Sequence, residues 1–459
     1  MPESTVRPSE PIWKSDVLSL YQRLLPASLL QQWQDCAGIR QNNRIYTFLV
    51  VMWLLIVQRL YGGAPLEFAV LNLLGGLPAN FWPRPCKRLQ TWQQDPHSLS
   101  SHSGAYKQAR QELPLTLVEQ TCDRIFDQLT ASLEGALPTL KIRAFLLDGT
   151  SVRLARTAAL RELYPPGFNQ YREGHWPLLR LLVAHDLQTG LAMRPVWGAM
   201  HGPDAVSEQQ LLETAIDRLP SGAALLGDAN FGVFSVAYAA MQWDHPVLLR
   251  LTIARALRLA GMPLRDGMDQ SVLWRPSRED RRSHPQLPAD ACVRGRLIVR
   301  QVQPSNNAIP FLLALFTTLQ ADQDEILPLY GNRWHIETDL RTLKSTLQLD
   351  QLTCTTPDMV AKEMNMAIAA YNLVRAVTCL AAQRSGIPPR SYSFTRVRRV
   401  VETFTPLLAN AKHEDQARMY FDRMMYYVGQ AKLPNRSRPR LSYPREVWPR
   451  GDSFPHRKE

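Results

Sequence analysis

The chain has 459 residues, of which 45% are hydrophobic and 20% are charged. This length predicts two to four domains, and the hydrophobic content is sufficient for real cores and excludes a globally disordered chain. The formal net charge of +12 favours a polyanionic partner, with nucleic acid as the first candidate, against the alternative of a basic protein that has no such partner.

The first part of the chain, residues 1–140, is predicted to be helical. Pro- and Gly-rich loops interrupt it, and the stretch SHSGAYKQARQELP introduces a further helix. The longest apolar run, IYTFLVVMWLLIV, has 13 residues, short of the roughly 20 that span a membrane, so we interpret it as a buried helix. Apolar segments of helical character lie near residues 16–33, 45–60 and 114–133.

From residue 141 the hydrophobic period changes from that of a helix to that of strands. IRAFLLDGTSVRLA contains an apolar run, an Asp-Gly pair and an alternating segment, which predicts two strands joined by a tight turn. PLLRLLVAHDLQTGLAMRPVWGAM repeats the pattern, with Thr189-Gly190 in the turn region. Asp186, just before that turn, is interpreted as a turn residue.

The next segments continue a mixed α/β sheet. DAVSEQQLLETAIDRL predicts a helix that Asp204 could cap, and GAALLGDANFG predicts a buried strand that ends at Asp228. A helix, VFSVAYAAMQ, and a strand, HPVLLRLT, follow. Residues 253–308 break this rhythm with a Pro- and charge-rich stretch between two strand-like segments, and we interpret them as an insertion.

After the insertion, a strand leads into a helix that carries Glu337, and a further helix is predicted over residues 356–384. From Ser385 to the end there are 15 Lys or Arg against 7 Asp or Glu, and the last 25 residues are expected to be extended. We therefore predict five regions: a helical region, a first sheet region, a β-rich insertion, a second sheet region and a basic region, at 1–140, 141–252, 253–308, 309–385 and 386–459.

Two features limit the location and the chemistry of the protein. The segment MPESTVRPSEPIWKSD lacks the basic and then apolar pattern of a signal peptide, so we expect a cytoplasmic protein with no membrane partner. The six cysteines include no CxxC pair, so we expect reduced thiols without a special role.

Three acidic residues follow elements of the predicted sheet or lie on the late helix: Asp148, Asp228 and Glu337. Carboxylates gathered from two strand ends and a helix can bind hard cations such as Mg²⁺. Each also has a simpler interpretation. The pair Asp148-Gly149 is a frequent hairpin turn, Asp228 could cap the next helix, and Glu337 could form a surface ion pair one helical turn from Arg333 or Arg341.

The late helix, LYGNRWHIETDLRTLKSTLQL, carries its polar residues on one stripe. At roughly 100° per residue, Tyr330, Glu337 and Lys344 fall within about 40° of one another. Arg333 and Arg341 lie to either side of this stripe, at roughly 60° and about 20° from Tyr330. An apolar stripe adjoins it, so we expect a half-buried site at the border; its residues are Leu329, Ile336, Leu340, Leu343 and Leu347.

The spacing Y-x2-R-x3-E-x6-K in YGNRWHIETDLRTLK resembles the signature of the bacterial insertion-sequence transposases of the DDE superfamily, in the group named after insertion sequence four. LLDGTSVRL, LLGDANFG, a β-rich insertion and the signature helix follow one another in a similar order, and the resemblance covers about residues 40 to 450. It implies a ribonuclease H-like α/β fold: a mixed sheet interrupted by the insertion, with helical N-terminal and basic C-terminal regions.

The resemblance also implies roles for individual residues. Asp148, Asp228 and Glu337 would be the catalytic carboxylates and would bind two Mg²⁺ ions, for which Mn²⁺ can substitute. DNA phosphates would be held by the cationic and aromatic residues of the stripe: Tyr330, Arg333, Arg341 and Lys344. In the insertion, Trp274 is a candidate for stacking on a DNA base, against the alternative of a core tryptophan.

The activity implied by the resemblance is cut-and-paste DNA transposition: metal-assisted cleavage at transposon ends, then attack of the freed 3′-hydroxyl on target DNA. The implied partners are the terminal inverted repeats, the target DNA and a second copy of the chain, in a bacterial cytoplasm at the nucleoid. Two alternatives are a catalytically decayed repressor that binds DNA ends and a structure-directed nuclease of the same fold. The group commonly has Gly where this chain has Asn230, and since Asn tolerates positive φ better than most residues, the same turn is expected.

Overall fold

A computed structural model describes residues 15–41, 45–78, 81–82, 86–98, 100–137, 141–168, 173–303, 309–350 and 352–434. The helical prediction for the first part of the chain is confirmed within these residues. The apolar segment near 16–33 forms two helices and not one, because Pro26 cannot continue a helix and begins the second instead. The helices and the short 3₁₀ turn η2 are α1 (Val17–Leu24), α2 (Ala27–Cys36), α3 (Phe48–Leu60), α4 (Leu66–Leu74), α5 (Lys87–Gln94), η2 (Pro96–Ser98), α6 (Gly104–Glu112) and α7 (Leu115–Leu133).

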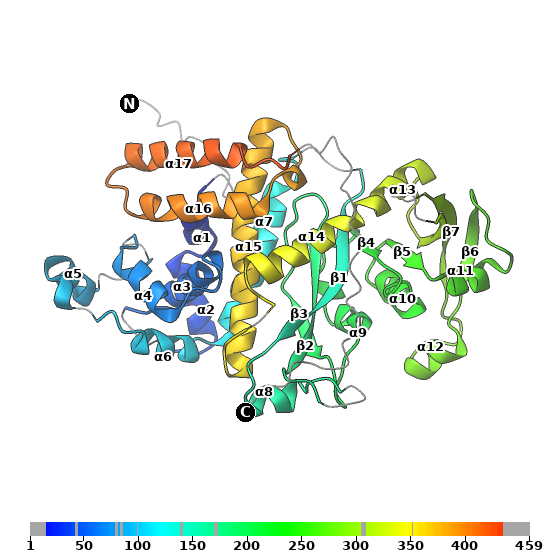
Figure 1. The fold of residues 1–459 in the computed structure, drawn as a ribbon, viewed down its shortest axis with the longest axis horizontal. Helices are drawn as coiled ribbons and strands as arrows, with labels where there is room; N and C mark the ends of the chain where they lie inside the picture. Colours follow the sequence, from blue (N-terminus) through cyan, green and yellow to red (C-terminus); the bar gives the residue numbers. More distant parts are fainter. Residues whose placement is uncertain are drawn as a thin grey trace, which may run out of the picture.

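The long helix α15 (Pro357–Ser385) runs between these helices and the sheet (Figure 1). It packs against α3 and α7, and also against α16 (Phe394–Ala409) and α17 (Glu414–Gly429). By length and composition α15 could cross a membrane, but its apolar window is entirely buried inside the protein. The run IYTFLVVMWLLIV lies in and just before α3, in which every residue is buried, as predicted.

The sheet has eight strands in the order β3-β2-β1-β4-β5-β8-β7-β6. Two neighbouring pairs, β1 with β4 and β4 with β5, are parallel, and the remaining pairs are antiparallel. The predicted mixed α/β sheet is therefore confirmed. The strands are β1 (Ala144–Arg153), β2 (Leu178–Asp186), β3 (Val196–Ala199), β4 (Ala224–Gly227), β5 (Val247–Leu251), β6 (Asp269–Trp274), β7 (Val293–Val302) and β8 (Phe311–Thr317).

The prediction of a hairpin turn at Asp148-Gly149 is wrong. Both residues lie in the middle of β1, which continues without a turn to Arg153. β1 is held on both sides, since it pairs with β2 along nine residues and with β4 at its first half. These long-range hydrogen bonds outweigh the local turn preference of an Asp-Gly pair. The turn predicted at Thr189-Gly190 is confirmed: Gly190 has φ +76°, and the Asp186 carboxylate accepts hydrogen bonds from Thr189.

Strands β6 and β7 of the predicted insertion extend the sheet beyond β8. The same region contains the short helices α11 (Ile253–Ala260) and α12 (Arg278–Ser283). Because β8 returns next to β5, the chain leaves and re-enters the rest of the sheet at neighbouring strands.

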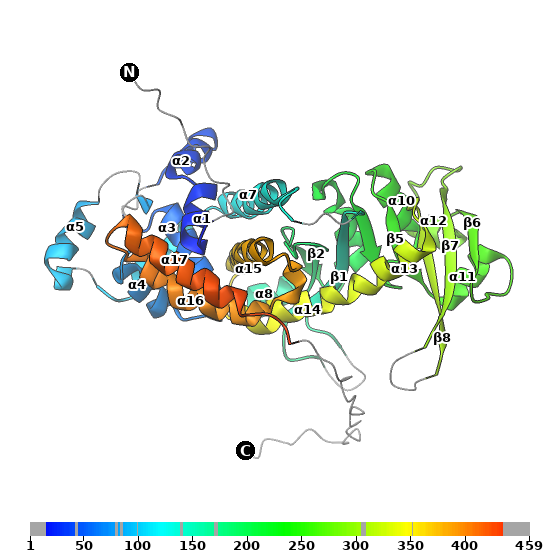
Figure 2. The ribbon, with the colours of Figure 1, turned by 90° about the horizontal axis from the view of Figure 1, so that it is seen from above.

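Helices lie on opposite faces of the sheet (Figure 2). The α10 helix (Phe234–Gln242) is on one face, and on the other run α13 (Gln323–Gly331) and α14 (His335–Arg341), which packs on β1. Helix α9 (Glu208–Glu213) contacts α10 and is capped by Ser207, not by Asp204 as predicted. The remaining short elements are α8 (Ala158–Leu163), η3 (Ile216–Arg218), η4 (Asn332–Trp334), η5 (Thr342–Thr346) and η6 (Pro389–Ser391).

Candidate active site

The register between β1 and β4 sets the level of the first two carboxylates. The last paired residues of these parallel strands are Leu146 and Leu226. Continuing this register by two residues brings Asp148 level with Asp228, which directly follows β4. The side chains of both residues are half-buried. Asp148, in the middle of β1, and Asp228, directly after β4, therefore lie at the same level of neighbouring strands.

Burial and neighbouring charges together set the pKa of the Asp148 carboxyl. Burial raises the pKa of the Asp148 carboxyl to about 6, and the negative charges of Asp228 and Glu208 act in the same direction. The Gly149 N–H, which donates to Asp148 Oδ1 at 2.8 Å, and the Arg333 cation lower the pKa of the same carboxyl. Burial is therefore the main reason why this carboxyl ionises less readily than an exposed one.

The turn after β4 fixes the orientation of Asp228. Asp228 Oδ1 accepts a hydrogen bond from the Asn230 N–H at 2.9 Å, and the Asp228 carbonyl accepts one from the Gly232 N–H at 3.0 Å. Helix α10 has its N-cap at Val233, so Asp228 is not a helix cap. Asn230 does not adopt the positive φ expected from the Gly of the resembling group. Its side chain makes contacts that a glycine could not make.

Glu337 and the residues before it come from the two helices that follow β8. Arg333 Nη2 lies 3.7 Å from Glu337 Oε1, and the Glu337 side chain is 38% exposed. Burial raises the pKa of the Tyr330 phenol; the charges of Arg333 and Arg250 lower it, and that of Asp228 raises it. Arg333 therefore pairs with Glu337 and also lowers the pKa of the Asp148 carboxyl and of the Tyr330 phenol.

The predicted single helix over Leu329–Leu349 is interrupted. The 3₁₀ turn η4 separates α13 from α14, and η5 is a π-helical turn, closed by the hydrogen bond from the Leu347 N–H to the Thr342 carbonyl at 3.1 Å. The apolar stripe predicted for this segment is buried in full. A uniform turn of 100° per residue therefore does not describe where the polar side chains point.

Lys344 lies in the π-helical turn and reaches β1. Its Nζ donates to the Thr150 Oγ1 at 3.2 Å, two residues beyond Asp148. Arg341 is exposed and, within the part of the chain that the structure describes, makes no hydrogen bond or ion pair with the acidic residues of the site. Lys344 therefore lies against β1 and Arg333 beside Glu337, whereas Arg341 is exposed.

Glu208 is a fourth carboxylate at this site, and the sequence did not predict it. It is the first residue of α9, where its oxygen Oε2 accepts a hydrogen bond from Asn230 Nδ2 at 2.5 Å. Burial raises the pKa of the Glu208 carboxyl. The stretch VSEQQ contains a helix-start signature, Ser and then Gln three residues later, but that signature gives no sign of the long-range contact with the β4 turn.

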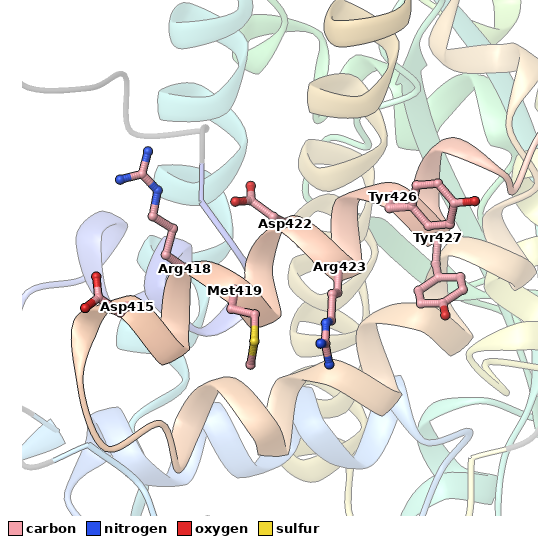
Figure 3. A pocket seen from close by; sticks show the side chains of 7 residues that line it. All are labelled: Asp415, Arg418, Met419, Asp422, Arg423, Tyr426 and Tyr427. Atoms are coloured by element: carbon pink, nitrogen blue, oxygen red, sulfur yellow. The ribbon is translucent and has the colours of Figure 1, made fainter.

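Trp274 and a hollow on α17 both lie apart from the carboxylates. Trp274 is 7% exposed and packs edge-on against Phe234 and Phe316, so a DNA base could stack on it only if this part of the core opened. A surface hollow of about 630 Å³ lies along one face of α17 (Figure 3). Its lining comes from that helix alone and lies away from the carboxylates.

The donor atoms of the candidate site suit a hard cation, because Asp148, Asp228 and Glu337 offer carboxylate oxygens, which Mg²⁺ prefers. Within the residues that the structure describes, no three His, Cys, Asp or Glu side chains lie close enough together to hold a metal ion as they stand. The Glu337 side chain interacts with Arg333 in this arrangement. Chemistry and charge therefore fit a cation, whereas a complete set of ligands is not assembled.

The fold and the gathered carboxylates define an α/β protein with an acidic candidate active site on a mixed sheet. Residues 139–373 match the family model described as "Transposase DDE domain", which is just over half of the chain. The chain belongs to this family. The resemblance inferred from the sequence is thereby confirmed.

The chain is similar in sequence to one bacterial transposase and aligns with one solved structure. Over 298 residues, 63% of this chain, it is 24% identical to "Transposase InsG for insertion sequence element IS4" from Escherichia coli (strain K12). The match spans 64% of that protein, slightly less than two thirds. A cryo-EM structure of the piggyBac transposase synaptic complex with hairpin DNA aligns with 93% of this chain and 84% of its own, at a TM-score of 0.39 and 10% identity. A TM-score of that size does not establish a shared fold.

Proposed function

We propose that this protein is a DNA transposase that cleaves DNA at transposon ends and joins the freed 3′-hydroxyl to target DNA. The observation that supports this proposal most directly is the register of β1 and β4, which brings Asp148 level with Asp228. Helix α14, which carries Glu337, packs on β1. These three residues lie inside the segment that matches the transposase family model.

In this proposal Asp148, Asp228 and Glu337 hold Mg²⁺, for which Mn²⁺ can substitute. Bound there, two such ions would supply Lewis acidity to the scissile phosphate and lower the pKa of a water molecule. Burial raises the pKa of the Asp148 carboxyl, and a cation bound there would favour its ionised form.

The cationic residues beside the carboxylates would orient the DNA. Arg333 presents a planar guanidinium that suits a phosphate, and Lys344 adds a point charge on the β1 side of the site. Burial raises the pKa of Tyr330, which keeps its phenol protonated at neutral pH and able to donate a hydrogen bond to a phosphate oxygen. Arg341, which is exposed outside this group, is proposed as a contact to a more distant phosphate.

The wider assignments follow from the same proposal. The first five strands have the order β3-β2-β1-β4-β5, with the first three antiparallel and the last two pairs parallel, which supports a ribonuclease H-like core. We propose that regions 1–140 and 386–459 contact DNA, that two copies act together on two ends, and that the protein works at the nucleoid in the cytoplasm. Residues 435–459 of the basic region lie outside the described residues.

The test is strand cleavage of a duplex that carries a terminal repeat of the element, with Mg²⁺ and then Mn²⁺, comparing wild type with Asp148→Asn and Glu337→Gln. We expect wild type to cut and both variants to lose cleavage, while binding to the duplex stays within a few-fold. Binding without cutting by wild type would indicate a decayed repressor. Cutting that ignores the terminal sequence and gives no strand joining would indicate a structure-directed nuclease.

A further inference from the structure

Glu208 is held in place by its own helix start. Ser207 caps α9: its Oγ accepts from the Gln210 N–H at 3.2 Å, and Gln210 Oε1 accepts from the Ser207 N–H at 2.8 Å. This capping box fixes the backbone just before Glu208. The carboxylate therefore projects from a defined point toward β1 and the β4 turn.

Glu208 fills the space that a side chain at Gly149 would need. A Cβ at Gly149 would lie 2.2 Å from Glu208 Oε1 and 2.5 Å from its Cγ. Successive side chains of a strand point to opposite faces, so Asp148 and Thr150 face Lys344 and α14, whereas the Gly149 position faces Glu208. Glu208 therefore approaches β1 from the face opposite to α14.

The other oxygen of Glu208 holds the turn that carries Asp228. Glu208 Oε2 accepts from Asn230 Nδ2 at 2.5 Å, and the Asn230 N–H in turn donates to Asp228 Oδ1 at 2.9 Å. The neighbouring Gln209 donates through Nε2 to the Asn230 carbonyl at 2.6 Å and to its Oδ1 at 2.9 Å. Both polar atoms of the Asn230 side chain are thus bound by the first turn of α9.

We propose that Glu208 is a positioning residue for the carboxylate of Asp228 and that it acts through Asn230. Gly149, which has no side chain, leaves the space through which Glu208 reaches the turn after β4. The inference rests on the proposed function, since Asp228 is a metal-binding residue only in that proposal. It assigns Glu208 no direct contact with a metal or with DNA. It also accounts for Asn230, where the resembling group commonly has Gly.

The test compares Glu208→Ala with Glu208→Gln. The Gln side chain keeps an oxygen that can accept from Asn230, although a neutral amide is a weaker acceptor than a carboxylate. We therefore expect the Mn²⁺ affinity and the cleavage rate of Glu208→Gln to stay within about fivefold of wild type. Ala removes the acceptor, and we expect both quantities to fall about 10- to 100-fold, as for other residues that orient metal ligands. Glu213→Ala, at the other end of α9 and beside His284, is the matched control and should leave both unchanged.

A second pair of variants tests the contact with Gly149. Gly149→Ala should displace Glu208 and lower Mn²⁺ affinity in the wild-type background. In the Glu208→Ala background the same substitution should have little effect, because no side chain remains to be displaced. An equal loss in both backgrounds would overturn the proposal.

The outcomes separate this inference from the proposed function. Calorimetry measures Mn²⁺ binding in the absence of DNA, so it reports on Asp228 even if the wild-type protein does not cut DNA. If wild type binds Mn²⁺ but does not cut, the proposed function fails and the positioning role of Glu208 stands. Equal losses in Glu208→Gln and Glu208→Ala would overturn the positioning role and make Glu208 a metal ligand. Wild-type Mn²⁺ affinity in Glu208→Ala would remove any role, and circular-dichroism melting of each variant distinguishes these results from unfolding.

Discussion

At the scale of single residues, the candidate site depends on contacts that a local sequence pattern cannot reveal. Asp148 and Asp228 could be predicted because each follows a short apolar run, and Glu337 because it lies on a polar stripe. Glu208 could not be predicted, since a Glu in the first turn of a helix is favourable for the helix itself. Its connection to Asn230 spans 22 residues and exists only after the sheet has formed.

Lys344 allows a test of the proposed phosphate contact. Lys344→Ala should weaken binding to end DNA and reduce the slope of log affinity against log salt by about one phosphate contact. The measurement is a salt titration of binding by fluorescence anisotropy in the presence of Ca²⁺. Thr150→Val, which removes the hydroxyl that Lys344 contacts but no charge, is the control and should leave the slope unchanged. A slope unaltered in Lys344→Ala would show that this ammonium does not meet a phosphate.

At the scale of elements, α14 is anchored by a buried carboxylate on its far side. Asp339, two residues after Glu337, is fully buried and accepts from Arg375 Nη2 at 2.6 Å and from the Tyr371 hydroxyl at 3.0 Å. It also accepts from Arg390, which donates to the Asp186 carbonyl at 2.7 Å. Asp339 thereby joins α14 to α15 and to the end of β2.

Asp339→Ala should reduce the free energy of unfolding by about 3–5 kcal/mol, because two arginines would be left buried without their partner. Asp350→Ala breaks an ion pair with Arg153 whose side chains are 41% and 46% exposed, and it should cost at most about 1 kcal/mol. Urea unfolding of the two variants beside wild type measures the difference. Similar losses in both would contradict an anchoring role for Asp339.

The interruptions of the late segment also belong to this scale. Periodicity correctly predicted which residues are buried, because burial follows the average turn of the helix. It did not predict the 3₁₀ and π-helical turns, which depend on packing and on single hydrogen bonds. Lys344 nevertheless reaches β1 from the π-helical turn, a kind of irregularity that is frequent at functional sites.

At the scale of the whole molecule, the helical region and the sheet are joined by buried polar groups whose charges depend on pH. His185 is fully buried on β2, packed edge-on against Tyr371 of α15. Burial lowers the pKa of His185 to about 4, while Asp339 raises it and Arg390 and Arg375 lower it. The arginines also hold the pKa of Asp339 well below its usual range.

These shifts predict acid instability. Unfolded His185 takes up a proton below about pH 6.5, whereas folded His185 does so only near pH 4, so the free energy of unfolding should fall as the pH decreases from about 6.5 to 4. Below about pH 4 the lowered pKa of Asp339 adds a further loss. Urea unfolding across this range should show a shallower slope for His185→Phe and an unchanged slope for a substitution of the exposed His102. Equal slopes for His185→Phe and wild type would contradict the assignment.

How far the fold could be predicted also depends on scale. The helical first part, the mixed sheet and the strand before Asp228 followed from periodicity, which local side-chain patterns encode. The prediction of a turn at Asp148-Gly149 was wrong because β2, more than 30 residues further along the chain, pairs with β1 through both residues. The pairing of strands depends on the whole chain, so the sequence of one segment does not determine which strands become neighbours.

The path of the chain between β5 and β8 has a practical consequence for engineering. Leu251 of β5 pairs with Ala314 of β8, so everything between them begins and ends at one place on the sheet. β6 and β7 add to the outer edge beyond β8 and do not separate the strands that carry Asp148 and Asp228. A shortened or exchanged segment should therefore leave the order of these strands intact, provided that it keeps Arg255, whose Nη1 donates to the Ala229 and Gly232 carbonyls in the turn after β4.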